Sequence, residues 1–131
     1  MNGNRALPLI LLLAALSAGS APAAAGALDE CQTAGDHAAV TKCLFDADAE
    51  AQASLRNAEG VAGIRAREID TATGRSGANA ALAKTLRAFT EYRTMQCNYV
   101  KALYASGSGA EQAWLACRVD LTRRRVRDLQ P

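Results

Sequence analysis

Histidine is almost absent from this sequence of 131 residues, since His37 is the only one. It has no companion at metal-ligand spacing, and nothing near it in the sequence suggests a Ser or Cys nucleophile that it would activate. The chain also lacks the G-x-x-x-x-G-K-[ST], H-E-x-x-H and G-x-S-x-G motifs. We therefore predict that the protein is not an enzyme and binds no cofactor.

Close cysteine pairs are missing as well. The four cysteines are Cys31, Cys43, Cys97 and Cys117. No two of them form the C-x-x-C pair with which structural zinc sites bring two ligands from one turn to the same ion, so no metal site is predicted. In a short exported chain, four cysteines indicate two disulfides instead.

Neither sign of charge is in large excess, with 15 Lys and Arg against 13 Asp and Glu. This near balance argues against nucleic acid as the main partner, because nucleic acid requires a strongly basic face. The distribution is uneven, since acidic residues gather in the first third and arginines near the C-terminus. The simpler interpretation is that the two regions attract each other; the alternative is an acidic face presented to a basic partner.

No apolar run is long enough to span a membrane. The run Ala6–Leu16 is interrupted by Pro8, whereas a spanning helix needs about 20 apolar residues. Arg5 precedes it and the small residues of segment 17–25 follow it, which is the pattern of a secretory signal peptide. We predict a signal peptide over residues 1–25. The small-residue rule would be satisfied by cleavage after Ala23, Ala25 or Ala27.

The remaining residues, 26–131, are enough for one compact domain and too few for two. We expect this domain to be periplasmic or secreted, without a further membrane span. Its apolar residues recur at threes and fours, and no segment alternates as a strand would. The predicted fold is all-α, a small bundle of about three helices with a disulfide-stapled hairpin.

The first predicted helix begins after Asp36, a plausible N-cap. Gly60 and Gly63 disfavour its continuation, because each costs about 1 kcal/mol relative to Ala in a helix interior. Two further amphipathic segments, Asn79–Tyr104 and Ala110–Leu129, are joined by a Gly/Ser turn. These two segments predict an antiparallel helical hairpin.

The hairpin favours one of the three pairings that four cysteines allow. Cys97 and Cys117 lie equally far from Gly107, the centre of the turn. In an antiparallel hairpin their side chains sit at the same level and can face each other. We therefore predict Cys97–Cys117, which leaves Cys31–Cys43 to attach the entry segment to the first helix.

Acidic residues of the first helix are the candidate contacts for a partner, namely Asp46, Asp48 and Glu50. Asp46 and Glu50 are four residues apart and share one helix face. No further carboxylate or histidine at ligand spacing makes an acid–base pair of them. They are predicted to form a solvated face that a basic protein can contact.

Arg93 occupies a step in the apolar stripe of the second predicted helix, between Phe89 and Cys97. A charge turned inward there needs a carboxylate or carbonyl partner, and the hairpin register suggests Asp120. The alternative is an arginine at the edge of the stripe that points to water.

Two segments of the hairpin carry a family resemblance. They read Leu82-x-x-x-Leu86-x-x-Phe89-x-x-Tyr92-Arg93-x-x-x-Cys97 and, after the Gly/Ser turn, Cys117-x-x-x-Leu121-Thr122-x-x-Arg125-x-x-x-Leu129. Together with the region from Cys31 to Leu55, they resemble the LprI-type lysozyme-inhibitor domain over nearly the whole mature chain. Phe89 stands where that family usually has Trp, and Leu86 where it usually has Gln.

The resemblance implies an exported helical domain that binds a protein, with a cationic lysozyme as the candidate partner and inhibition as the candidate activity. The alternative is a structural or adaptor module of the cell envelope that blocks no enzyme. The acidic first helix favours the inhibitor, because opposite charge speeds the encounter with a basic enzyme.

Overall fold

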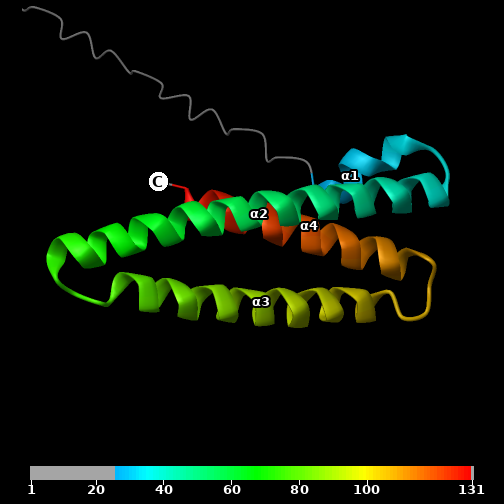
Figure 1. The fold of residues 1–131 in the computed structure, drawn as a ribbon. Helices are drawn as coiled ribbons and strands as arrows, with labels where there is room; N and C mark the ends of the chain where they lie inside the picture. The colour runs from blue at the N-terminus through cyan, green and yellow to red at the C-terminus, as the bar shows by residue number, and fades with distance from the viewer. Residues whose placement is uncertain (1–25, 131) are drawn as a thin grey trace, which may run out of the picture.

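A computed structural model describes residues 26–130, and Figure 1 shows how their helices are arranged. The elements are α1 (Ala27–Cys31), the short 3-10 helix η1 (Gln32–Ala34), α2 (His37–Thr73), α3 (Ala78–Leu103) and α4 (Gly109–Leu129). The described residues form no strand, and the predicted all-α fold with three long helices is confirmed. The predicted signal peptide lies outside these residues.

The longest helix, α2, begins where predicted and runs further than predicted. Asp36 Oδ1 accepts a backbone N–H of the first turn at 2.9 Å and so caps the helix. The helix then continues through Gly60 and Gly63 to Thr73, so the two glycines do not interrupt it. It ends at Gly74, whose φ of 64° lies in the left-handed region that glycine adopts without steric cost.

Asp70, near the end of α2, also holds the start of α3. Its carboxylate accepts the backbone N–H of Ala78 at 2.8 Å and that of Asn79 at 3.0 Å. The first N–H groups of a helix have no partner within that helix. Asp70, which belongs to α2, therefore caps the N-terminus of α3. This contact closes the turn between the two antiparallel helices (Figure 1).

Helix α4 is the centre of the domain. It contacts α1, α2 and α3, and in Figure 1 it starts between α2 and α3 and passes behind α2 toward its C-terminal end. Its buried residues are Ala110, Ala113, Leu115, Ala116, Val119 and Thr122. Three of them, Leu115, Ala116 and Val119, form one core with Val40, Leu44 and Ala51 of α2. Alanines on both helices allow α2 and α4 to approach closely. Because α4 also contacts α1 and α3, it is buried on several sides.

The entry segment forms a short helix, α1, that the sequence did not predict. Ala27 and Cys31 are buried in the common core. The N–H of Ala27 donates to Asp120 Oδ1 of α4 at 2.9 Å, across 93 residues of chain. At the start of α2, His37 Nε2 lies 2.9 Å from the carbonyl oxygen of Ser108, which ties α2 to the α3–α4 turn.

Both predicted disulfides are present. Cys31–Cys43 links α1 to α2, and Cys97–Cys117 links α3 to α4. The second pairing confirms the argument from hairpin register. The first explains how a helix of five residues keeps its place on the surface of α2.

Candidate partner-binding surface

The three acidic residues predicted as partner contacts do not share one surface. Asp46 forms an exposed ion pair with Lys42, one turn earlier, with an N–O distance of 2.6 Å. Asp48 is turned toward α4, and its side chain is 14% exposed. Glu50 is exposed and borders a hollow beside Arg123 of α4. Asp46 and Glu50 therefore remain accessible, whereas Asp48 belongs to the packing of the domain.

Asp48 accepts two hydrogen bonds from Arg118 of α4, at 2.9 Å from Nη2 and 3.3 Å from Nε. The guanidinium of Arg118 also lies 4.6 Å from the ring centre of Trp114. Trp114 Nε1 in turn donates to Asn98 of α3 at 3.2 Å. One series of contacts thus joins α2, α4 and α3, and it uses the two-pronged pairing and ring stacking that distinguish Arg from Lys.

Removing either partner of the Asp48–Arg118 pair is expected to destabilise the domain. We expect Asp48→Ala and Arg118→Ala each to lower the free energy of unfolding by about 2 kcal/mol, because each leaves a largely buried charge unpaired. Urea unfolding measures the loss. The double variant should lose less than the sum of the single losses.

The exposed Lys42–Asp46 pair provides the matched control. Its side chains are 76% and 68% exposed, so either alanine variant should change the free energy of unfolding by less than about 1 kcal/mol. Strictly additive losses for Asp48 and Arg118 would contradict the coupling that the geometry indicates.

The prediction that Arg93 pairs with Asp120 is wrong. Arg93 Nη1 donates instead to the hydroxyl of Thr122 at 2.8 Å, and Asp120 accepts the N–H of Ala27. Thr122 is fully buried, so the guanidinium is turned toward the interior. The inward orientation was predicted, but the partner is a hydroxyl and not a carboxylate.

Cationic side chains gather around Phe89 of α3. The guanidinium carbons of Arg93 and Arg125 lie 5.4 and 5.6 Å from its ring centre. Burial lowers the pKa of Arg93, the positive charge of Arg118 lowers it further, and two nearby carboxylates act in the opposite direction. The face of the aromatic ring attracts both cations and partly offsets their mutual repulsion.

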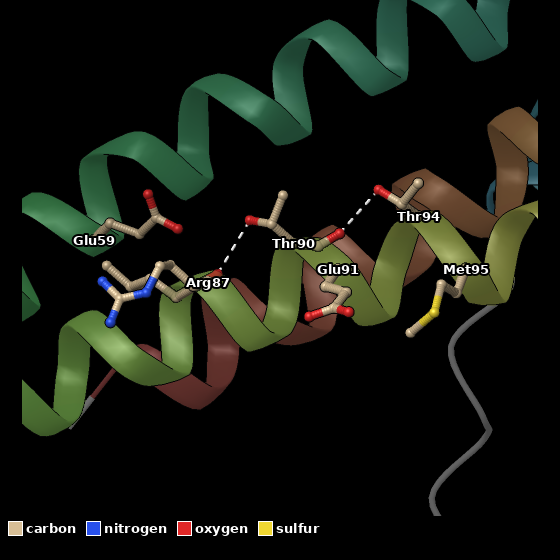
Figure 2. Close-up of a pocket in the computed structure, with 7 residues that line it drawn as sticks. Glu59, Arg87, Thr90, Glu91, Thr94 and Met95 are labelled. Carbon is tan, nitrogen blue, oxygen red and sulfur yellow. Dashed lines mark hydrogen bonds between the residues drawn. The ribbon is translucent and has the colours of Figure 1, made fainter.

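A pocket opens between α2 and α3, with a volume of about 570 Å³. Figure 2 shows the residues that line it, which are Glu59 of α2 and Leu86, Arg87, Thr90, Glu91, Thr94 and Met95 of α3. The hydroxyls of Thr90 and Thr94 donate to carbonyls of their own helix, at 3.1 and 2.9 Å. Their protons are thus occupied, and the pocket offers apolar surface together with three charged side chains.

An exposed apolar strip runs along α3 beside this pocket. Its members are Tyr92, Met95, Tyr99 and Leu103, which are 51, 60, 59 and 63% exposed; we call them the α3 strip. Their spacing of three or four residues places them on one face of the helix. Met95 also lines the pocket, so the two features form one surface. Single exposed apolar residues are common, whereas several on one face are typical of a protein contact.

The α3 strip was not predicted from the sequence. The apolar stripe predicted for this helix is a different series, which includes Phe89 and Cys97. Both series repeat at helical spacing. The sequence alone does not show which of the two is covered by neighbouring helices. The sequence did contain one signal for the α3 strip, because α3 carries more apolar residues than one buried face requires.

Residues 26–130 contain no group of three or more His, Cys, Asp or Glu side chains that could hold a metal ion. Within the same range, no helix is both long enough and apolar enough to cross a membrane. The α3 strip and the pocket offer apolar contact with charges nearby, which is the chemistry of a surface that binds a protein.

A family model described as "Lysozyme inhibitor LprI" matches residues 28–129. The match spans the three long helices and all four disulfide-bonded cysteines. No curated protein and no solved structure matches the chain.

Proposed function

The chain belongs to the LprI lysozyme inhibitor family, and on that premise we propose that its mature domain binds and inhibits a lysozyme in the periplasm or outside the cell. The observation that carries the proposal is the family match over residues 28–129. The two disulfides support the location, because such bonds persist in oxidising compartments. The domain acts in this proposal as a binding protein and carries out no chemistry.

We propose the α3 strip as the surface that contacts the enzyme. Tyr92 and Tyr99 offer large amphipathic side chains with few rotatable bonds, and Met95 adapts to irregular surfaces. The pocket beside them offers a recess for a protruding side chain. Glu59 and Glu91 line this recess, and neither forms an ion pair among residues 26–130. A Lys or Arg of a cationic enzyme would complement them.

The accessible acids of α2, Asp46 and Glu50, have a different role in this proposal. They lie outside the pocket, where their charge attracts a cationic partner before contact. Asp48 contributes indirectly, because its pair with Arg118 holds α2 against α4.

A lysis assay tests the function directly. Purified mature domain is added in increasing amounts to a lysozyme acting on a cell-wall suspension, and turbidity is followed. We expect the rate of clearing to fall as the domain reaches micromolar concentration. A lysozyme that remains fully active at micromolar excess and low salt would reject inhibition. The adaptor role would then lead, and capture of partners from an envelope extract would test it.

Electrostatic steering predicts that inhibition weakens with salt. Between about 0.05 and 0.2 M salt, the Debye length falls below about 8 Å, and association should slow several-fold. Asp46→Asn with Glu50→Gln should reduce this salt dependence while the fold is kept, as surface plasmon resonance at several salt concentrations would measure. The matched control is Glu68→Gln with Asp128→Asn, which removes two exposed carboxylates elsewhere. An equal effect of both pairs would show that net charge alone matters.

A further inference from the structure

The end of the α2–α3 hairpin projects beyond α4. The last residues of α4 share a hollow with Val61 of α2, and Arg125 donates to Thr85 of α3 at 2.9 Å. Residues 62–84 continue past these two contacts, and we call them the arm. Figure 1 shows the arm on the left, where α2 and α3 extend beyond the C-terminus as a pair of helices. Its α2 part, which ends at Thr73, is about 18 Å long.

No residue of the arm is buried, since each is exposed or half-buried. The side of α2 that packs on α4 nevertheless continues into the arm, because Leu55, Ala62 and Ile69 are spaced by about two helical turns. Leu55 is 5% exposed, whereas Ile69 is 51% exposed. The same side of the helix thus loses its cover where α4 ends. Helices owe most of their stability to packing, so the arm gains from contact with a further surface.

The arm carries more cations than acids. Its basic residues are Arg65, Arg67, Arg75 and Lys84, all of them exposed. None of the four forms an ion pair among residues 26–130. Of the two acids, Asp70 accepts N–H groups of α3, and only Glu68 is exposed. The arm therefore presents free positive charge together with two half-exposed side chains, Ile64 and Ile69.

The acidic part of the domain lies away from the arm. Segment 26–55 contains six Asp and Glu residues against one Lys. Glu50, the last of these acids, is about 18 Å from the start of the arm along the axis of α2. Arg56 and Glu59 lie between the two regions and balance each other. Because the Debye length at physiological salt is about 8 Å, the arm presents its charge independently of those six acids.

We propose that the arm docks on an anionic lipid surface. Its arginines and its lysine contact the phosphates of the headgroups, and Ile64 and Ile69 enter the boundary between headgroups and acyl chains. Interfacial helices use this combination of cationic and apolar side chains. Such docking goes beyond the proposed inhibition and does not depend on it. The α3 strip, which begins at Tyr92, lies outside the arm and stays free for a protein partner.

Charge and shape favour a lipid surface over other occupants. A second copy would bring the same excess of cations, so two arms placed side by side repel each other. The hollow on the arm is lined by residues of α2 alone and is therefore not a cleft between two helices. A lipid surface needs no cleft, because it offers an anionic layer above an apolar layer wherever the arm meets it.

Vesicle sedimentation tests the docking. Mature protein purified from the envelope or medium is mixed with vesicles of equal parts phosphatidylglycerol and phosphatidylcholine, or of phosphatidylcholine alone, in 0.1 M salt. We expect a partition coefficient about 100-fold higher on the anionic vesicles, because each cation near such a surface strengthens binding about fivefold. Equal binding to both vesicles would overturn the proposal. Failure to bind the anionic vesicles would also overturn it and would make an acidic protein the candidate partner of the arm.

Matched charge variants locate the contact on the arm. Arg65→Gln with Arg67→Gln should weaken binding to the anionic vesicles about 25-fold, since two cations are lost. The control is Arg124→Gln with Arg127→Gln, which removes two exposed cations of α4 that also form no ion pair among residues 26–130. This control should bind within about twofold of the parent protein. An equal loss in both variants would show that net charge alone matters and would overturn docking through the arm.

The apolar contribution is tested with Ile64→Ala and Ile69→Ala combined. This variant keeps every charge, and it should bind the anionic vesicles about tenfold more weakly, because fewer apolar groups enter the boundary. Circular dichroism of each variant establishes that the helices are kept. Unchanged vesicle binding by a folded alanine variant would overturn the insertion of these side chains.

Discussion

Replacement of all four cysteines by alanine is expected to leave the domain largely unfolded at 37 °C. The disulfides close loops with sequence separations of 12 and 20 residues, and each should stabilise the fold by about 3 kcal/mol on the chain-entropy model. Their sum, about 6 kcal/mol, is comparable to the whole stability of many small domains. Circular dichroism at 222 nm during heating would show the loss of a cooperative transition. Alanine is chosen because Cys31 and Cys97 are buried and a serine hydroxyl would add a cost of its own.

The two disulfides should contribute separately. Removing only Cys97 and Cys117 should lower Tm by about 15 °C, because a loss of 1 kcal/mol shifts Tm by about 4–8 °C in a domain of this size. The helices should still form below that temperature, since α3 and α4 keep their apolar contacts. A four-alanine variant as stable as the parent within about 1 kcal/mol would contradict the role assigned to the disulfides.

Under the proposed function, truncation of the α3 strip is expected to weaken inhibition of lysozyme by about 100-fold. Met95→Ala with Tyr99→Ala removes two adjacent side chains that are each about 60% exposed in the isolated domain. Central aromatic anchors contribute roughly 2 kcal/mol or more to binding, and each 1.4 kcal/mol corresponds to a tenfold change in affinity. The inhibition constant in the lysis assay measures the effect.

A matched control separates this effect from a general loss of apolar surface. Ile64 and Ile69 of α2 are 52% and 51% exposed and lie outside both the α3 strip and the α2–α3 pocket. Their double alanine variant should inhibit as well as the parent protein. If it weakens inhibition equally, or if the α3 variant inhibits normally, the proposed contact surface is wrong. Thermal unfolding of both variants would establish that neither change acts through the fold.

The helices were predictable because their signals are local. The cap at Asp36 depends on residues within one turn, and the apolar periodicity of each long helix extends over several turns. The Cys97–Cys117 pairing was predictable because a short turn sets the level of both cysteines. The continuation of α2 past Gly60 and Gly63 was not, since long flanking helical segments outweigh a cost of about 1 kcal/mol per glycine.

The candidate site was predicted only in part. The sequence identified acidic residues of α2, but it did not separate Asp48, which pairs with Arg118, from Asp46 and Glu50, which face water. Side chains two positions apart point to nearly opposite sides of a helix, so one acidic run contains both kinds. Which side of α2 is covered by α4 depends on how the helices pack. The charge pattern along one helix does not show it.

At Arg93, too, the sequence predicted one part of the contact and the tertiary structure decided the other. The hairpin register predicted Asp120 as the partner of this residue, but the partner is Thr122, two residues further along α4. Those two positions are about 200° apart around the helix axis, so Asp120 faces α1 while Thr122 faces α3. The sequence by itself determined the three long helices, their order and both disulfides, because periodicity, caps and a short turn act along the chain. Only the tertiary structure decided which side of each helix meets which neighbour, because rotation about a helix axis changes every contact while the sequence pattern stays the same.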